Sequence, residues 1–203
     1  MASQESHHHA LRAIETARLR LRPCTAGDAD DLHRLWTDAY VRRYLWDDIV
    51  ITRERAAAEI NTSIRSFQRR GFGLWVVCLK GESSLVGFCG LRSFGEPAEV
   101  EMVVGLAPAY WGRGLATEAS RAMLRYGFEE VGLERIYGGA DPPNAASIRL
   151  MERCGMTFAK KMRVNDIEAV YYAVSRDAFQ LQLAPNENDL SGRDRRRRLR
   201  ATI

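Results

Sequence analysis

A chain of 203 residues, with 46% apolar and 28% charged residues, has the length and composition of one globular domain with short tails. No apolar run reaches the roughly 18 residues of a membrane helix, and the first residues lack the apolar segment of a secretory signal, so we expect a cytoplasmic protein without membrane contact. The formal net charge of +4 is concentrated in residues 184–203, where six arginines outnumber three acidic residues. The rest of the chain is nearly neutral, which argues against a dedicated nucleic-acid-binding protein.

The cysteines and histidines give little indication of a metal site or a disulfide. The cysteines stand at no C-x-x-C or comparable spacing, which predicts buried free thiols at Cys24, Cys78, Cys89 and Cys154. The three adjacent histidines, residues 7–9, are a weak metal signal at a chain terminus. We therefore expect no metal site.

The first third of the chain predicts one strand and two helices. Residues 18–22 alternate polar and apolar side chains, which is typical of a half-buried strand, and Pro23 ends it. A helix is expected from about Thr25, with an apolar face formed by Leu32, Leu35, Trp36, Ala39 and Tyr40. A second helix is expected to begin at an N-cap, Thr52, and to end at Gly71.

The middle of the chain predicts an antiparallel meander, and the last part predicts helices and strands in alternation. Three β-patterned segments are separated by short turns: residues 74–79, 85–91 and 100–104. A glycine-rich loop at 111–114 then opens a helix to about Glu130. The elements expected beyond it are a strand over 135–140, a helix over 143–153, and strands over 157–163 and 168–175 with a turn at 165–166. We expect a flexible arm over residues 1–15, the domain over 16–180, and a basic disordered tail over 181–203.

The glycine-rich loop is the segment that carries chemistry. A pyrophosphate is bound by several backbone N–H groups aimed at one point and by the positive end of a helix, and a glycine-rich turn before a helix offers both. Gly112 and Gly114 let the backbone approach the phosphates, and Arg113 adds charged donors. The loop has neither the G-x-G-x-x-G order of dinucleotide-binding folds nor the Gly-Lys-Ser/Thr of nucleoside triphosphatases. Taken alone, it is also compatible with an ordinary helix start.

Longer stretches around this loop resemble the GNAT acyltransferase superfamily, and within it the ribosomal-protein N-terminal acetyltransferase branch. The resemblance spans about residues 16–175 and is densest over 99–158. It rests on the segments EMVVGLAPAYWGRGLATEA at 101–119, RYGF at 125–128 and PNAASIRLMERCGM at 143–156, together with TARLRLRP at 16–23 and YLW at 44–46.

The resemblance implies an acetyl-CoA-dependent N-acetyltransferase with one α/β domain. Its mixed, mostly antiparallel seven-stranded sheet would splay between the fourth and fifth strands and be flanked by about four helices. Acetyl-CoA would enter the splay, with its pantetheine arm along the fourth strand and in contact with Asn144, which is also a plausible helix N-cap. The residues expected to bind the cofactor are Val103, Val104, Leu106, Trp111, Gly112, Arg113, Gly114, Leu115, Ala116, Thr117, Asn144 and Ser147.

The acceptor amine must lose a proton before it attacks the thioester, since its pKa is about 8 for an α-amine and about 10.4 for a lysine. Glu101 matches the family's acidic position beside the cofactor and is the predicted base, acting through a water, with Glu99 as the alternative. Glu101 is also interpretable as an exposed strand carboxylate. The tyrosine that many members use as an acid is Met151 here. Ser147 and Tyr171 are the remaining candidates for an acid, although they also fit a helix start and strand packing.

Acceptor choice is expected to come from the turn at 163–168 and from the loop over residues 40–52, where Asp47 and Asp48 supply negative charge suited to a cationic amine. Tyr44 and Trp46 offer an aromatic wall there, and Glu99 is expected to contact the acceptor as well. The loop also fits a simple connection between helices. The acceptor would be a protein N-terminus or a small-molecule amine. A catalytically silent acyl-CoA-binding regulatory module is the alternative, and ribosome contact through the arginine-rich tail and a monomer or homodimer are further expectations.

Overall fold

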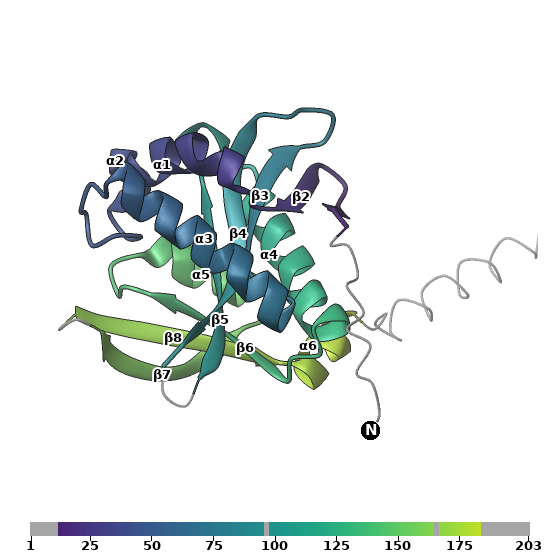
Figure 1. Cartoon of the computed structure of the whole chain (residues 1–203). Coiled ribbons are helices and arrows are strands. Elements are labelled where there is room, and N and C mark those ends of the chain that lie inside the picture. The colour runs from purple at the N-terminus through teal and green to yellow at the C-terminus, as the bar shows by residue number, and fades with distance from the viewer. Residues whose placement is uncertain (1–11, 96–97, 165–166, 184–203) are drawn as a thin grey trace, which may run out of the picture.

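Eight strands of the described chain form one sheet (Figure 1). The computed structural model describes residues 12–95, 98–164 and 167–183. The spatial order is β1-β2-β3-β4-β5-β6-β8-β7, and neighbouring strands are antiparallel except for the parallel pair β5 and β6. The strands are β1 Ile14–Glu15, β2 Leu19–Pro23, β3 Leu74–Leu79, β4 Leu85–Phe94, β5 Glu99–Leu106, β6 Arg135–Ala140, β7 Thr157–Val164 and β8 Ile167–Ser175. The expected mixed, mostly antiparallel α/β fold is confirmed, and the strand beyond the seven expected is the short β1.

Six α-helices of the described chain flank the sheet, compared with about four expected. They are α1 Ala29–Thr37, α2 Ala39–Arg42, α3 Arg53–Arg70, α4 Leu115–Arg125, α5 Ala145–Arg153 and α6 Arg176–Leu183. A π-helical turn, Tyr126–Glu130, extends α4 to the predicted end of that helix. Figure 1 shows α3 crossing in front of β3, β4 and β5, while β7 and β8 run across the lower part of the sheet.

The break between α1 and α2 corrects one prediction. Asp38 has a ψ of 132°, outside the helical range, and its carboxylate accepts hydrogen bonds from the N–H groups of Tyr40 (2.9 Å) and Val41 (3.2 Å). This cap restarts the helical phase, so that Val41 is buried while Ala39 and Tyr40 are exposed. The expectation that Ala39 and Tyr40 extend the apolar face of the first helix is wrong.

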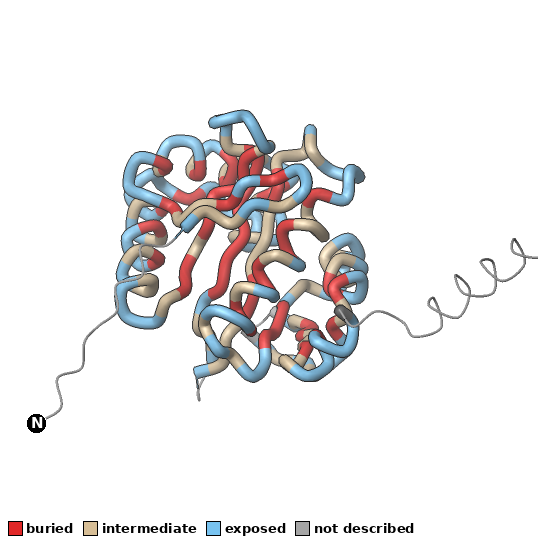
Figure 2. Tube along the Cα trace, turned by 90° about the vertical axis from the view of Figure 1, so that its right-hand side faces the viewer, coloured by how far each residue is buried: buried red, intermediate tan, exposed pale blue. Residues whose placement is uncertain are grey.

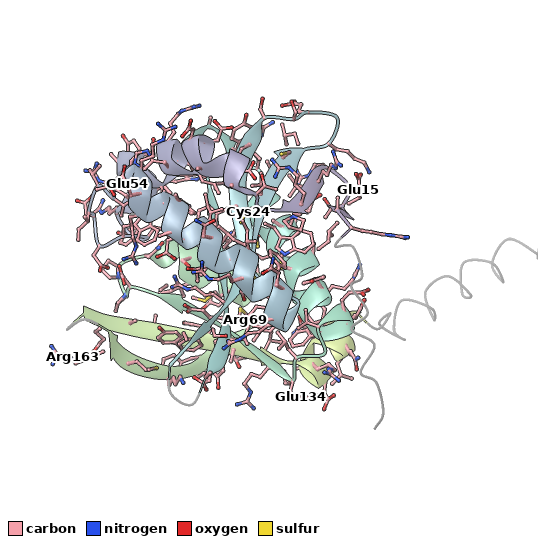
Figure 3. The ribbon with its side chains drawn as sticks, in the orientation of Figure 1. Glu15, Cys24, Glu54, Arg69, Glu134 and Arg163 are labelled. Atoms are coloured by element: carbon pink, nitrogen blue, oxygen red, sulfur yellow. The ribbon has the colours of Figure 1, made fainter. Side chains whose placement is uncertain are left out.

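Helix α3 begins and ends as predicted and is tied to the sheet by a buried serine. The Thr52 hydroxyl caps its first turn, and Gly71 ends it with a φ of 76°. The Ser63 hydroxyl accepts hydrogen bonds from the Leu74 N–H (2.6 Å) and from the Cys24 thiol (3.3 Å). Figure 3 labels Cys24 beside α3. As predicted, all four cysteines are free and buried.

The sheet separates two hydrophobic cores, because successive side chains of a strand point to opposite faces. On the α4 side, Met102 and Leu106 of β5 pack in one cluster with Met123. On the side of α1 and α3, Val103 packs in the other cluster with Trp36. Figure 2 shows the buried segments gathered along the central strands, with exposed segments around them.

Strands β5 and β6 part soon after they meet. They are paired at one position, Glu101 opposite Tyr137, whereas β5 pairs with β4 along its whole length. Residues 102–106 therefore have backbone polar groups on the β6 side without a strand partner. This observation confirms the predicted splay, which lies between β5 and β6.

Some predicted segments lie outside the described residues, namely 1–11 of the arm, the turn at 165–166 and the tail from 184 onward. Within the described part, β1 starts inside the expected arm and α6 crosses the expected tail boundary at residue 181. In the described ranges, no helix combines the length and the apolar character needed to cross a membrane.

A partly buried ion pair joins β2 to the turn before α1. Asp28, which is 7% exposed, accepts two hydrogen bonds from the Arg22 guanidinium (2.6 and 2.8 Å) and one from the Thr25 N–H (2.7 Å). Burial raises the pKa of Asp28, but the hydrogen bonds from Arg22 and Thr25 outweigh it and hold the pKa below its ordinary value. Asp28 therefore stabilises the fold as an anion.

Replacing Asp28 by Asn should lower the free energy of unfolding near neutral pH by about 1–3 kcal/mol, because Arg22 loses its charged partner. Since the folded-state pKa is lowered, this contribution is present above the unfolded-state pKa of about 3.9 and disappears as the pH falls through the folded-state value. Urea denaturation of both proteins across this pH range measures it. The control is Asp31→Asn, whose pair with Arg34 is exposed and should contribute less than about 0.5 kcal/mol. Equal losses in the two variants would contradict the prediction.

Candidate active site

The parallel arrangement of β5 and β6 brings two loops to the same edge of the sheet. Strand β5 is followed by a short turn, Pro108–Tyr110, and by the glycine-rich loop, residues 111–114, which leads to α4. Strand β6 runs into residues 141–144, which lead to α5. Because the carboxyl ends of neighbouring parallel strands lie at one edge, the gap between β5 and β6 opens toward both loops.

Trp111 fixes the start of the glycine-rich loop. Its indole N–H donates to the Leu106 carbonyl (2.7 Å), and its backbone N–H donates to the Pro108 carbonyl (3.1 Å). The ring is half exposed, with its centroid 6.3 Å from that of the Tyr40 ring. Both Trp111 donors are thus occupied, so the backbone donors that remain for a phosphate begin at Gly112.

Two glycines with left-handed backbone shape the loop. Gly112 and Gly114 have φ values of 70° and 75°, which L side chains rarely adopt. A Cβ on Gly112 would meet nothing within 4 Å, so the conformation and not the available space requires glycine there. Gly114 precedes α4 and has no side chain with which to cap it. The N–H groups of Leu115, Ala116 and Thr117 are therefore left for an acceptor from outside.

The side chains in and next to the loop have two different roles: Leu115 packs in the core, and Arg113 supplies a positive charge. Leu115 is 3% exposed and packs in the core, so it offers a phosphate only its backbone. Arg113 is exposed, and its guanidinium lies 5.7 Å from the centroid of the Tyr110 ring. The loop thus combines free N–H groups, a helix N-terminus and a cation, which together suit a diphosphate.

Asn144 begins α5 on the β6 side of the gap. Its Oδ1 accepts a hydrogen bond from the Ser147 N–H (3.1 Å), which confirms the predicted N-cap. The Asn144 amide nitrogen and the Ser147 hydroxyl have no partner among the described residues, and both residues are partly exposed. A cofactor contact from either group stays a prediction that this geometry leaves open.

Glu101 lies where β5 and β6 separate, and only 4% of it is exposed. Its Oε1 accepts a hydrogen bond from Arg92 Nε on β4 (2.7 Å). A Cβ on Gly139 of β6 would lie 3.3 Å from Glu101 Oε2 and 2.9 Å from the Tyr171 ring. The glycine therefore makes room for both side chains, and Glu101 is buried, unlike an ordinary exposed strand carboxylate.

Tyr171 belongs to the same cluster as Glu101. It is 6% exposed, and its ring stacks on Phe94 with centroids 5.0 Å apart. Burial and, to a lesser extent, the charge of Glu101 raise the pKa of Tyr171, so the hydroxyl keeps its proton at neutral pH. The structure brings together two of the three predicted catalytic residues, while Ser147 lies on α5 without a described contact to either.

Glu99 shares a sheet face with Glu101 but has a cation of its own. The hydrogen bond from Lys160 on β7 holds the pKa of Glu99 below its ordinary value. The Lys160 ammonium also lies 4.8 Å from the centroid of the Tyr137 ring. Glu99 is therefore less available than Glu101 as a base, and its predicted contact with the acceptor would have to displace Lys160.

The loop between α2 and α3 lies near the end of β6. Burial and, to a lesser extent, the charge of Asp47 raise the pKa of Asp141. Trp46 packs edge-on against Trp36, with centroids 5.8 Å apart, while Tyr44 is partly exposed. Of the predicted aromatic wall, Trp46 mainly serves the core. Sequence reasoning missed Asp141, although an acidic residue directly after a strand of a parallel pair is a signal for this edge.

The comparison with known families decides the identity. Residues 18–157 match the family model described as an acetyltransferase (GNAT) domain. The chain belongs to the GNAT acetyltransferase family. It is an N-acetyltransferase, and its acetyl donor is acetyl-CoA. It is 28% identical over 163 residues to an uncharacterized N-acetyltransferase, p20, of Bacillus licheniformis (78% of this chain and 88% of that one). It is 26% identical over 139 residues to the spermidine N(1)-acetyltransferase of Escherichia coli K12 (68% and 73%).

Solved structures share the fold. A GNAT-family acetyltransferase from Bacillus anthracis superposes with a TM-score of 0.69 at 27% identity, covering 82% of this chain and 99% of that one. A RimL ribosomal L7/L12 alpha-N-protein acetyltransferase in complex with coenzyme A superposes with a TM-score of 0.69 at 19% identity, with the same coverage. The second likeness concerns the fold alone.

The residues of this acetyltransferase fit acetyl-CoA on the donor side. The free N–H groups of the loop suit the pyrophosphate, and the unpaired β6 side of residues 102–106, which include Val103, Val104 and Leu106, suits an extended pantetheine arm. Met151, at the position expected for an acid, is 3% exposed and packs against Gly138, so it serves the core. Across the described ranges, no group of three or more His, Cys, Asp or Glu side chains could hold a metal ion.

Gly114→Asp should weaken acetyl-CoA binding by more than about tenfold with the fold intact, because it adds a carboxylate beside the phosphates and a side chain at a left-handed position. Calorimetric titration measures the affinity. Gly114→Asn has nearly the same shape without the charge, and Asn tolerates this backbone, so it should lose less. Wild-type affinity in Gly114→Asp would remove the loop from the site.

Proposed function

We propose that this enzyme acetylates a primary amine by direct attack on the thioester of acetyl-CoA, with Glu101 as the general base. The observation that carries the proposal is the buried Glu101 carboxylate at the point where β5 and β6 separate. No covalent enzyme intermediate is needed, because an amine freed of its proton is itself a sufficient nucleophile.

The two oxygens of Glu101 have different surroundings. Oε1 is bonded to Arg92, which balances the buried charge. Oε2 lies on the Gly139 side and has no described partner, so it is the oxygen available to accept the amine proton, directly or through a water. A protonated amine with a pKa of about 8 to 10.4 needs such an acceptor near neutral pH.

The other groups of the transfer lie around the same gap. Backbone N–H groups near Val103 and Val104, on the unpaired side of β5, are suited to stabilise the oxyanion of the tetrahedral intermediate. The leaving thiolate, whose thiol has a pKa of about 8.5, needs little help from an acid. Tyr171, which keeps its proton, and Ser147 stay the candidates for that help.

The acceptor we propose is an amine that carries or adjoins positive charge, either a small-molecule amine or a protein N-terminus. Two carboxylates near the open edge, Asp47 and Asp141, have no described cation partner, and burial next to Asp47 makes the charge of Asp141 costly. A cationic acceptor would relieve this repulsion. Similarity to a spermidine acetyltransferase supports a small-molecule amine as the acceptor.

For a protein N-terminus as the acceptor, we propose that the enzyme belongs to the ribosomal-protein N-terminal acetyltransferase branch. Ribosome contact through residues 184–203, which lie outside the described residues, belongs to it as well. We further propose a cytoplasmic location, supported by four free buried cysteines, and a monomer or homodimer.

A catalytically silent acyl-CoA-binding module is the second candidate function. Two observations favour it: the ion pair between Glu101 and Arg92, and the buried Met151 at the expected acid position. Such a module would bind acetyl-CoA at the loop but release no coenzyme A with any amine. A thiol-release assay separates the two functions.

Glu101→Gln should lower kcat by about 10²- to 10⁴-fold while leaving acetyl-CoA affinity nearly unchanged, because Gln keeps the shape but accepts no proton. The variant has no base to remove the proton from the amine, so its residual rate should depend on amine that is already neutral and should rise with pH as the amine loses its proton. The rate–pH profile of thiol release measures both effects.

Glu99→Gln is the matched control, since Glu99 lies two residues away on the same strand face and is paired with Lys160. Its effect on kcat should be smaller. Near-full activity of Glu101→Gln with an unchanged profile would show that the enzyme only positions an already neutral amine.

A panel of spermidine, simple monoamines and N-terminal peptides should show turnover with at least one acceptor and a preference for the more cationic ones.

Asp141→Asn should raise KM for spermidine about fivefold, the equivalent of about 1 kcal/mol for a partly exposed charge pair, and change KM for a monoamine less. As the pH falls, protonation of Asp141 should raise the wild-type KM for spermidine. Because the pKa of Asp141 is raised, this increase should begin at a pH above the range of an ordinary Asp. Equal effects of Asp141→Asn on all acceptors would contradict a charge role.

A further inference from the structure

Glu118, a carboxylate on α4, binds the segment of chain that leads into β2. Glu118 Oε1 accepts hydrogen bonds from the Thr16 hydroxyl (2.6 Å) and the Arg18 N–H (2.8 Å), and Oε2 accepts one from Arg18 Nε (2.7 Å). Burial raises the pKa of Glu118, but these hydrogen bonds outweigh it and hold the pKa below its ordinary value. The residues lie about one hundred positions apart in the sequence, so only the fold brings them together.

The Arg18 guanidinium extends this contact to the glycine-rich loop. While Nε is held by Glu118, Nη1 donates to the Arg113 carbonyl at 2.8 Å. Nη2 lies 3.5 Å from the point where a Cβ on Gly114 would stand. A rigid planar group, oriented by one carboxylate, thus holds the single peptide unit that joins Arg113 to Gly114.

The orientation of that peptide unit determines where one of the loop's donors points. In a trans peptide the C=O and the following N–H point in opposite directions. With the Arg113 carbonyl held toward Arg18, the Gly114 N–H is directed to the other side, and no described residue accepts from it. Glycines at 112 and 114 leave the free loop many other conformations, so a contact that selects this one reduces the entropy lost when a phosphate binds.

We propose that Arg18, oriented by Glu118, is a positioning residue for the cofactor: it sets the Arg113–Gly114 peptide so that the Gly114 N–H faces the pyrophosphate. The inference rests on the proposed role of the loop in binding the pyrophosphate. It makes the segment before β2 part of cofactor binding, although that segment lies far from the reacting atoms.

The test compares coenzyme A with pantetheine, which lacks the phosphates, by calorimetric titration. In Arg18→Met the Kd of coenzyme A should rise at least about tenfold, as expected for the loss of one charge-assisted hydrogen bond, while the Kd of pantetheine stays within twofold. Arg18→Lys should not restore affinity, because an ammonium cannot span Glu118 and the Arg113 carbonyl in one plane. The control is Arg20→Ala, an exposed arginine on β2 whose nearest acidic partner is Glu15 at 3.8 Å, and it should bind both ligands as wild type does.

Glu118→Gln provides a second variant that keeps the shape of the side chain. It should reproduce the selective loss of coenzyme A affinity, and adding Arg18→Met should cause no further loss, since the two residues act as one unit. Equal weakening of both ligands would overturn the proposal in favour of a general structural role, and so would unchanged affinity for coenzyme A. If wild-type protein itself binds pantetheine as tightly as coenzyme A, the assignment of the loop to the pyrophosphate fails instead.

Discussion

The separation of β5 from β6 is the constraint on which the rest of the site depends. Pairing stops after Glu101 and Tyr137, yet β4 and β8 hold the two strands on their outer sides, so the gap is maintained by the neighbours of the strands that line it. Backbone groups along residues 102–106 are left without a strand partner, and an extended ligand is the natural group to satisfy them. Since both strands are parallel, the gap opens toward the glycine-rich loop and toward Asn144. The proposed binding of the acetyl donor thus depends mainly on backbone geometry, and few of its contacts need a particular side chain.

The partner of each carboxylate determines what it contributes. Glu118 is satisfied by neutral and cationic donors from the segment before β2 and serves as an anchor. Glu99 has an internal ammonium partner in Lys160 and is largely occupied. Glu101 has one oxygen bonded to an arginine and the other free beside a glycine, which leaves it able to accept a proton. Asp47 and Asp141 have no described cation partner, and the preference for a charged acceptor that we propose rests on this pair. Four different environments thus underlie the roles that we propose for these acidic side chains in structure, catalysis and recognition.

Donor and acceptor sides of the gap differ in how closely they are tied to the fold. The donor side is built from backbone N–H groups, two left-handed glycines and a helix start, features that tolerate many side chains. The acceptor side, as we propose it, uses side chains of the loop between α2 and α3 and of the chain after β6, which can change without disturbing the sheet. This division explains how relatives that share a fold carry names that refer to acceptors as unlike as spermidine and a ribosomal protein.

The sequence by itself determined the elements that local signals control. Alternation predicted β2, and β-type segments bounded by turns predicted the following strands. The Thr52 cap and Gly71 set the limits of α3, and two glycines before an amphipathic helix predicted an anion-binding loop. The family resemblance added the splay, and it added the prediction, still untested, that Glu101 is the base. Only the tertiary structure decided that Glu101 is buried with one oxygen free of described partners. It also decided that the indole N–H of Trp111 donates to the Leu106 carbonyl, and that Glu118 binds residues about one hundred positions away. The reason is physical: strand register and helix docking set these contacts, and they depend on the packing of the whole chain, which no short sequence pattern contains.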